Sequence, residues 1–257
     1  MPQLKQSEWH KQWGLFRDEE LFLFQDWIYP NKLEDFQGKD VLDAGCGGGQ
    51  HTLFIAPYAK NITAVDLNTI DIAAQRNKYF KNINFFEDDI ALMDLGKKFD
   101  IVFSVGVIHH TDDPDKAVKN LKKHVKPGGK LILWVYSQEG NFLVSTIVEP
   151  LRKVCLRHLN RRVLLFVSKI ITILLYPVVY SLYKLPLRWL PYYEYFDNFR
   201  KLSFTRNCLN VFDKLNAPQV ELISKKRITE WFSGGDFKDI SITPYKGVSW
   251  CGSAVKI

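Results

Sequence analysis

The residues best suited to chemistry form a glycine-rich turn, Asp43-Ala44-Gly45-Cys46-Gly47-Gly48-Gly49-Gln50. An apolar stretch precedes the turn, and a helix-like stretch from His51 to Tyr58 follows it. Glycines there let the backbone approach a ligand, and the N–H groups at the start of the helix face it. Asp66 lies 21 residues after Gly45, where a carboxylate can accept both hydroxyl protons of a ribose. The pattern therefore predicts a nucleotide-type ligand.

Two details of the turn separate the alternative ligands. The dinucleotide-binding fingerprint of dehydrogenases, G-x-G-x-x-G, would place a glycine where this chain has Gln50. Asp43 adds a carboxylate two residues before the first glycine, and this carboxylate would repel a pyrophosphate. Both features disfavour an NAD-type dehydrogenase, and they favour a ligand that carries an ammonium group.

The elements that must position these residues alternate between strands and helices. Apolar runs typical of buried strands occupy residues 40–46, 61–67, 83–89, 99–105 and 130–136. Between them lie stretches such as 69–80 and 114–125, with apolar residues three and four positions apart. This alternation predicts a parallel sheet covered on both faces. Pro127-Gly128-Gly129 predicts a turn before the fifth strand, and residues 239–246 and 250–257 predict a closing antiparallel hairpin.

Together these segments resemble the motif series of class I S-adenosylmethionine-dependent methyltransferases. The series comprises VLDAGCGGGQ (41–50), AVDLN (64–68), EDDI (87–90), FDIVFSVGVIHH (99–110) and VKPGG (125–129). As an ordered set these motifs are far more specific than the glycine turn alone. The resemblance implies a Rossmann-like α/β methyltransferase fold, with a mostly parallel seven-stranded sheet. It also implies S-adenosylmethionine as the cofactor.

The resemblance further implies roles for residues near the glycine turn. Gly45 and Gly47 would approach the methionine part of the cofactor, and Asp43 would help to orient its amino group. Asp66 would hold the ribose, with Leu67 beside the adenine. These assignments place most of the cofactor contacts at the ends of the first two strands.

Three more contacts are implied after the third and fourth strands. Asp89 would accept a hydrogen bond from the adenine amino group, and the Ile90 N–H would face the ring. The carbonyl around Val105 would receive the cofactor ammonium. The cofactor site would thus be assembled from the ends of four neighbouring strands.

His109 and His110 follow the fourth strand, at the sheet edge where open α/β folds bind ligands. An imidazole titrates near neutrality, so either residue could be the general base for a protonated acceptor, with His110 preferred. The alternative is that the pair only orients or packs the loop, and the sequence leaves this open. No set of side chains stands out at metal-ligand spacing, so no metal is predicted.

Residues 141–206 interrupt the alternation and differ in composition from the rest of the chain. Residues 151–206 contain eleven Lys and Arg and two acids, a net charge of +9, which leaves −2 elsewhere from the total of +7. The most apolar run, 163–183, is close to the length of a bilayer span, but Lys169 and Pro177 interrupt it. A membrane-spanning helix is therefore disfavoured.

We expect residues 141–206 to form a helical lid, inserted between core segments 39–140 and 207–257, with residues 1–38 as an N-terminal helical cap. The basic, apolar lid could also contact an anionic membrane surface or a lipid-linked acceptor. Basic residues that alternate with long aliphatic ones disfavour a nucleic-acid partner. The four cysteines form no disulfide framework and the N-terminus has no apolar core, so a cytoplasmic location is predicted, with peripheral membrane contact as an option.

The function predicted from these features is methyl transfer by in-line displacement from S-adenosylmethionine to a small or lipid-linked acceptor. One alternative is a non-catalytic protein that keeps the nucleotide or S-adenosylmethionine site only for binding. The other is an NAD-type dehydrogenase, which the glycine turn already disfavours.

Overall fold

The computed structural model describes residues 21–156 and 159–257, which divide into two compact units. The first unit holds residues 21–136, 219–245 and 250–257 and contains the central sheet. The second unit lies within Ser137–Pro218 and Lys246–Ser249 and is helical. The boundary expected at residue 206 is displaced, because it falls inside α9 (Phe204–Asn216), which packs against another helix of the second unit.

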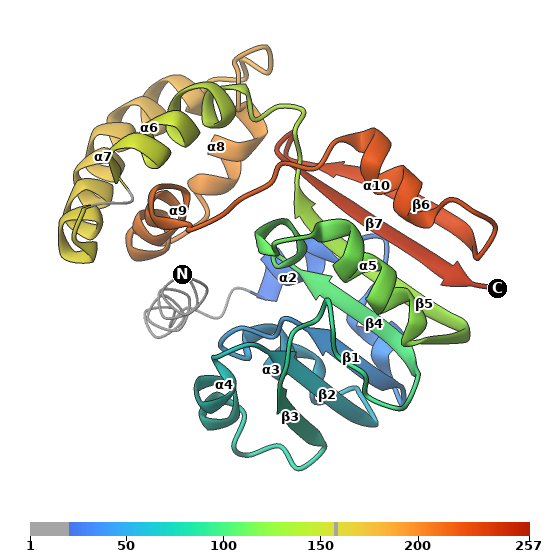
Figure 1. The fold of residues 1–257 in the computed structure, drawn as a ribbon. Helices are drawn as coiled ribbons and strands as arrows, with labels where there is room; N and C mark the ends of the chain where they lie inside the picture. The colour runs from blue at the N-terminus through green and yellow to red at the C-terminus, as the bar shows by residue number, and fades with distance from the viewer. Residues whose placement is uncertain (1–20, 157–158) are drawn as a thin grey trace. The chain divides into compact units, whose positions relative to one another are not determined.

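Seven strands form one sheet in the order β3-β2-β1-β4-β5-β7-β6 (Figure 1). The strands are β1 (Asp40–Ala44), β2 (Asn61–Asp66), β3 (Ile83–Glu87), β4 (Phe99–Val105), β5 (Val125–Tyr136), β6 (Phe237–Tyr245) and β7 (Ser249–Lys256). β1 pairs in parallel with both β2 and β4, so the strand order changes direction between β1 and β4. Open α/β sheets bind ligands outside the carboxyl ends of their strands at such a point.

The predicted hairpin forms one edge of the sheet, whereas the predicted turn at Pro127-Gly128-Gly129 is absent. Three residues join the neighbouring strands β6 and β7, and so short a connection allows only an antiparallel pair. Pro127-Gly128-Gly129 lies inside β5 rather than in a turn before it. The register between β4 and β5 shifts at Phe99 and Ile101, and Gly128 has a φ of +74°. The strand therefore bulges at these residues instead of beginning after them.

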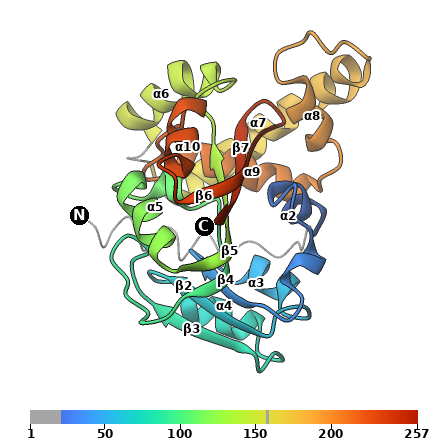
Figure 2. The same cartoon turned by 90° about the vertical axis from the view of Figure 1, so that its right-hand side faces the viewer.

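Helices cover both faces of the sheet (Figure 1 and Figure 2). One face packs against α2 (Leu21–Trp27), η1 (Leu33–Phe36), α3 (Gln50–Ile55) and α4 (Ile70–Arg76). The other packs against η2 (Ile108–His110), α5 (Pro114–Lys123) and α10 (Lys225–Phe232). Successive residues of β4 supply the two cores in turn, with Ile101 and Phe103 on the first face and Val102 on the second. Burial on both faces explains why these strands are apolar throughout.

The second unit contains the segment expected to be helical. Its elements are η3 (Val144–Val148, a π-helix), α6 (Glu149–Val154), α7 (Arg161–Ser181), η5 (Leu182–Lys184), α8 (Tyr193–Phe199) and α9. Phe212 and Leu215 of α9 and Leu164 of α7 belong to its apolar core. The described part of residues 141–206 is thus largely helical, and its role as an inserted lid stays a prediction.

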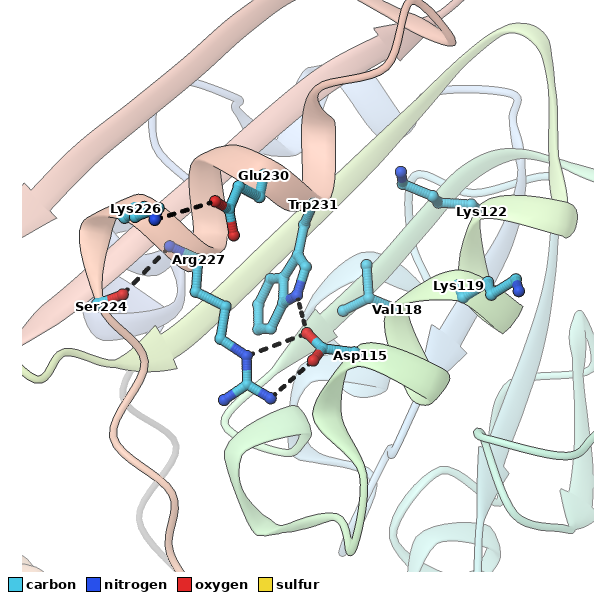
Figure 3. A pocket seen from close by; sticks show the side chains of 9 residues that line it. All are labelled: Asp115, Val118, Lys119, Lys122, Ser224, Lys226, Arg227, Glu230 and Trp231. Carbon is cyan, nitrogen blue, oxygen red and sulfur yellow. Dashed lines mark hydrogen bonds and ion pairs between the residues drawn. The ribbon is translucent and has the colours of Figure 1, made fainter.

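A charged clamp joins α5 to α10 in the first unit (Figure 3). Ser224 caps α10 by accepting from the Arg227 N–H. The Arg227 guanidinium donates from two nitrogens, at 3.0 Å each, to the two carboxylate oxygens of Asp115, and Trp231 Nε1 donates to the same carboxylate at 2.6 Å. The hydrogen bonds from Arg227, with a smaller contribution from Trp231, hold the pKa of Asp115 below its usual value.

We expect Asp115→Asn to lower the free energy of unfolding at neutral pH. The loss should be about 0.5–1 kcal/mol, because solvent screens a pair whose Asp115 side chain is 60% exposed. Ionised Asp115 stabilises the fold above the unfolded pKa of about 3.9, and this contribution is lost as the pH falls through the lower folded pKa. Urea unfolding over a pH series should show the two proteins converge in acid.

The control for this prediction is Lys226→Ala, which removes an exposed ion pair with Glu230 and should change stability little at any pH. A deficit in Asp115→Asn that stayed constant into strong acid would show that the contact does not depend on charge.

Candidate functional site

The glycine-rich turn follows β1 and owes its glycines to backbone conformation and close packing. Gly45, Gly47 and Gly49 have φ values of +86°, +51° and +74°, which side chains rarely allow. A Cβ atom on Gly45 would lie 2.5 Å from both Cγ atoms of Val107. A Cβ atom on Gly49 would lie 2.5 Å from Asn77 Nδ2. A side chain at Gly45 would therefore push apart the loops that follow β1 and β4. A side chain at Gly49 would push α3 away from α4.

The N–H groups of this turn bond mostly within the protein. Those of Gly45 and Cys46 both donate to the Val65 carbonyl, at 2.8 and 2.9 Å. The Gly47 N–H donates to Asp66 Oδ2 at 2.9 Å, and the Gly49 N–H donates to the Cys46 carbonyl at 2.8 Å. A pyrophosphate needs free N–H groups at this place. The turn therefore lacks the donors that a dinucleotide would require from these four residues.

Asp66 ends β2 and faces the glycine turn. Its Oδ2 accepts from Gly47, and its Oδ1 accepts from the Asn68 N–H at 3.3 Å. An ionised carboxylate has about four acceptor sites on its two oxygens, so each oxygen keeps a further lone pair. Leu67 follows directly and is exposed. The carboxylate is thus held in place by the backbone and can still accept from a diol.

Asp43 is a buried carboxylate inside β1, with 1% of its surface exposed. The Thr52 hydroxyl donates to its Oδ2 at 2.6 Å. Burial, together with the negative charge of Asp66, raises the pKa of Asp43 to about 7, although the Thr52 hydrogen bond opposes this. Within residues 21–156 and 159–257, no Lys or Arg forms an ion pair with Asp43. A ligand with an ammonium group would supply the missing positive charge.

The remaining predicted cofactor residues lie after β3 and at the end of β4. Asp89 Oδ1 accepts from the Ala91 N–H at 2.8 Å, while Ile90 is buried. Val105 is the last residue of β4 and is also buried. Because neighbouring parallel strands end at the same edge of the sheet, the fold brings these residues to the edge where Asp66 lies.

His109 is buried, and its environment is unsuited to proton transfer. Burial, with the nearby His110 adding, lowers the pKa of His109 well below its usual value. Its Nδ1 accepts from the Tyr136 N–H at 3.4 Å, which places the ring proton on Nε2. That Nε2 finds no hydrogen-bond partner among the residues that the structure describes. The ring lies 4.3 Å from the Tyr136 ring, so His109 mainly packs the loop.

His110 is only half-buried and has the tautomer that a base needs. Its Nδ1 lies 2.7 Å from the Gln219 carbonyl oxygen. A carbonyl can only accept, so Nδ1 carries the proton and the basic lone pair is on Nε2. The segment that supplies this carbonyl is fixed by two backbone bonds, from Glu221 to the His109 carbonyl at 2.8 Å and from Ile223 to the Tyr136 carbonyl at 2.9 Å.

Four residues that shape the site were not found from the sequence. Thr52 bonds to Asp43, the Thr69 hydroxyl donates to the Gly47 carbonyl at 2.6 Å, and Asn77 Nδ2 donates to the Gly49 carbonyl at 2.8 Å. Gln219 orients His110. Of these four residues, only Thr52 could have been identified from the sequence, because its hydroxyl lies in the first turn of the helix that follows the glycines. The other three meet the site through tertiary contacts.

The N-terminal cap and the prediction that no metal is bound remain to be compared with the structure. Part of the expected N-terminal cap, residues 1–20, lies outside the described residues. Across the rest of the chain as described, no group of three or more His, Cys, Asp and Glu is placed to hold a metal ion.

Comparison with known proteins relates part of this chain to methyltransferases. Residues 42–133 match the family model described as a methyltransferase domain. A ubiquinone biosynthesis O-methyltransferase of Coxiella burnetii is 34% identical over 116 residues, which are 44% of this chain and 50% of that protein. A tRNA U34 carboxymethyltransferase of Nautilia profundicola is 34% identical over 149 residues, 52% of this chain and 47% of that protein. The chain thus spans about half the length of these relatives.

A solved structure extends the similarity to the fold of most of the chain. The magnesium protoporphyrin IX methyltransferase of Synechocystis PCC 6803, crystallised with SAH, superposes with a TM-score of 0.53 at 14% identity. The match covers 96% of this chain and 94% of that one. Residues 42–133 therefore match a methyltransferase domain by sequence, and most of the chain shares its fold with a methyltransferase. The predicted Rossmann-like methyltransferase fold is confirmed, and the predicted family agrees with the domain matched over residues 42–133.

The buried Asp43 leads to a prediction about stability. We expect Asp43→Asn to stabilise the ligand-free protein above pH 7, because the variant buries no charge. The gain should be at most about 4 kcal/mol, the free-energy equivalent of a pKa moving from 3.8 to about 7. In the natural protein the raised pKa contributes stability in acid, and this contribution is lost as the pH rises through about 7. Thermal unfolding over a pH series measures this effect.

Asp40→Asn is the matched control on the same strand. Asp40 accepts from Asn61 and its pKa is lowered, so its replacement should not stabilise the protein at alkaline pH. If Asp43→Asn were instead less stable than the natural protein above pH 7, Asp43 would not be an uncompensated buried charge.

Proposed function

We propose that the protein binds S-adenosylmethionine at the carboxyl ends of β1, β2, β3 and β4 and transfers its methyl group to a small or lipid-linked acceptor. The main support is Asp43, a buried carboxylate with no cationic partner among the described side chains. The ammonium group of the cofactor would complete this site, because it provides the opposite charge that a buried carboxylate lacks.

The other residues of the site would share the binding of the cofactor. The Asp66 carboxylate would accept from the ribose hydroxyls, with Leu67 beside the adenine. Gly45 and Gly47 would let the backbone approach the methionine part, and the Val105 carbonyl would receive the ammonium. Asp89 and Ile90 would contact the edge of the adenine ring.

His110 is proposed as the general base for a hydroxyl acceptor. The cofactor supplies a methyl group on a positive sulfonium, so the electrophile needs no further activation. The protein must hold the acceptor in line and, where the acceptor carries a proton, remove it. The Gln219 carbonyl accepts from Nδ1 of His110 and so holds the ring, while the basic nitrogen, Nε2, is on the opposite side of the ring. His109, buried and with its proton on Nε2, would support the ring of His110 by packing against it at 4.2 Å.

The acceptor is the least constrained part of the proposal. The names of the two relatives concern ubiquinone biosynthesis and tRNA, and these are different classes of acceptor. We favour a small or lipid-linked acceptor because the basic residues of 151–206 alternate with long aliphatic ones. The second unit, as the proposed lid, would recognise it. Nucleic acid is the alternative that an acceptor assay must include, and a cytoplasmic location stays a prediction.

Cofactor binding tests the proposal directly. Calorimetric titration should show binding of S-adenosylmethionine and none of NADH, and Asp66→Ala should weaken the first by about 1–3 kcal/mol, the cost of unpaired hydroxyls. Asp94→Ala is the control, because the exposed Asp94 carboxylate accepts from the Gly96 N–H in a surface turn. Absent binding, preference for NADH, or equal affinities of the Asp66→Ala and natural proteins would contradict the assignment.

A turnover assay separates an enzyme from a non-catalytic binding protein. Transfer of a labelled methyl group should be measured to a lipid extract, a small-molecule extract and tRNA in parallel. With an oxygen acceptor, His110→Gln should lower kcat by about 10²–10⁴ and leave the affinity for S-adenosylmethionine unchanged. Undiminished kcat in this variant would exclude His110 as the base, and no transfer to any fraction would favour a binding protein.

A further inference from the structure

Helix α7 is unusually exposed for so apolar a segment. Arg161–Lys184, which comprises α7 and η5, is long and apolar enough to cross a membrane by length and composition, with a mean hydropathy of 2.2 over its most apolar stretch. Only 22% of that stretch is buried. The core helix of a water-soluble protein buries most of such a sequence. The outward face of α7 therefore needs a physical explanation.

The buried face of α7 contains two hydroxyl residues beside Leu164 and Val179, while large apolar residues lie on its exposed face. Its buried positions include Ser168 and Thr172, whereas Phe166 and Leu174 are 64% and 68% exposed. The two hydroxyls donate at 2.7 Å to the carbonyls one turn back, Leu164 and Ser168, so neither needs water. Small hydroxyl residues toward the protein and large apolar residues outward are typical of helices in contact with lipid.

The exposed apolar residues form a continuous stripe. Val163, Phe166, Ile170, Ile173 and Pro177 follow one another at spacings of three and four, and all five are exposed. Such spacing places them on one face of the helix. Leu174, four residues after Ile170 and three before Pro177, lies on the same face and is also exposed. We call this face, Leu174 included, the α7 stripe. Its length of four turns is more than isolated surface hydrophobic residues would produce.

Basic residues follow one margin of the α7 stripe. Arg162 and Lys169 are seven residues apart, so they share a side of the helix, and Tyr180 lies on the same side eleven residues further on. Arg161–Lys184 contains no Asp or Glu. Among the residues that the structure describes, neither Arg162 nor Lys169 forms an ion pair, and the acids Glu149 and Asp197 of the second unit pair with Lys153 at 2.9 Å and Arg200 at 2.6 Å. The margin therefore keeps its positive charge.

We propose that the α7 stripe inserts into the surface of an anionic lipid membrane, with the helix axis parallel to the bilayer. A lipid surface matches both features, because its acyl region accepts the stripe and its headgroups attract the basic margin. This inference rests on α7 alone and does not depend on the proposed methyl transfer.

The position of Lys169 distinguishes lying on the membrane from crossing it. Lys169 is the ninth residue of α7, so in a spanning helix it would lie about 12 Å from the helix start, well inside a hydrocarbon layer of about 30 Å. In a helix parallel to the surface, the same side chain reaches the headgroups along its aliphatic stem. The charge is therefore compatible with the parallel orientation.

Vesicle flotation with the full chain tests the inference. The protein should float with vesicles of phosphatidylcholine and about 30% phosphatidylglycerol, and much less with phosphatidylcholine alone. Phe166→Gln/Leu174→Gln should weaken binding at least about tenfold, because binding scales with the apolar area inserted. Lys169→Glu should weaken binding to the anionic vesicles only, and added salt should act in the same direction.

A control variant and further outcomes test the membrane inference. Tyr79→Gln/Ile240→Gln removes two exposed apolar residues of the first unit and should bind like the natural protein. Equal binding by the Phe166→Gln/Leu174→Gln variant would contradict the inference, as would the absence of binding by the natural protein. A dimer of the natural protein in sedimentation, absent in the Phe166→Gln/Leu174→Gln variant, would also contradict the inference, because a second copy of the chain would then cover the α7 stripe. Resistance to alkaline carbonate extraction would indicate a spanning helix instead.

Discussion

The burial of the Asp43 carboxylate is the constraint on which the site depends. An ionised carboxylate in the core of a sheet costs several kcal/mol unless charge and hydrogen bonds compensate it. Thr52 supplies one hydrogen bond, and Asp66 adds a second negative charge nearby. The ligand-free fold thus carries an unfavourable electrostatic arrangement that a cationic ligand would relieve.

The glycine turn and the strand ends form a rigid support for this charge. Backbone bonds to Val65 and Asp66 use most of the N–H groups of the turn, and the hydroxyl of Thr69 and the amide of Asn77 bind its carbonyls. A P-loop or dinucleotide turn leaves such donors free for phosphate. Here they hold the turn itself, so the nature of the bound group is left to the carboxylates. A pyrophosphate would find few free donors among the N–H groups of this turn.

The two units differ in how they treat apolar surface. The first unit buries its apolar strands between two layers of helices. The second unit has an apolar core of its own, but it also directs large apolar side chains of α7 outward while Ser168 and Thr172 are buried. The excess positive charge of the chain also lies in residues 151–206. Water favours the first arrangement, whereas a boundary between water and lipid favours the second.

The sequence by itself determined the sheet, its hairpin edge and the class of the domain, because these follow from local signals. Apolar runs, helix caps such as Ser224, and the order of the motifs around Asp43 and Asp66 can be read without knowing any long-range contact. Only the tertiary structure shows that Nδ1 of His110 faces the Gln219 carbonyl, because this carbonyl comes from a segment 109 residues away. It also decided that Pro127–Gly129 lies within a strand and that α9 joins the second unit, since pairing with β4 and packing on α7 override local turn and composition signals. The exposure of Phe166 and the burial of Thr172 belong to the same category, because periodicity defines the faces of a helix but not which of them meets the protein.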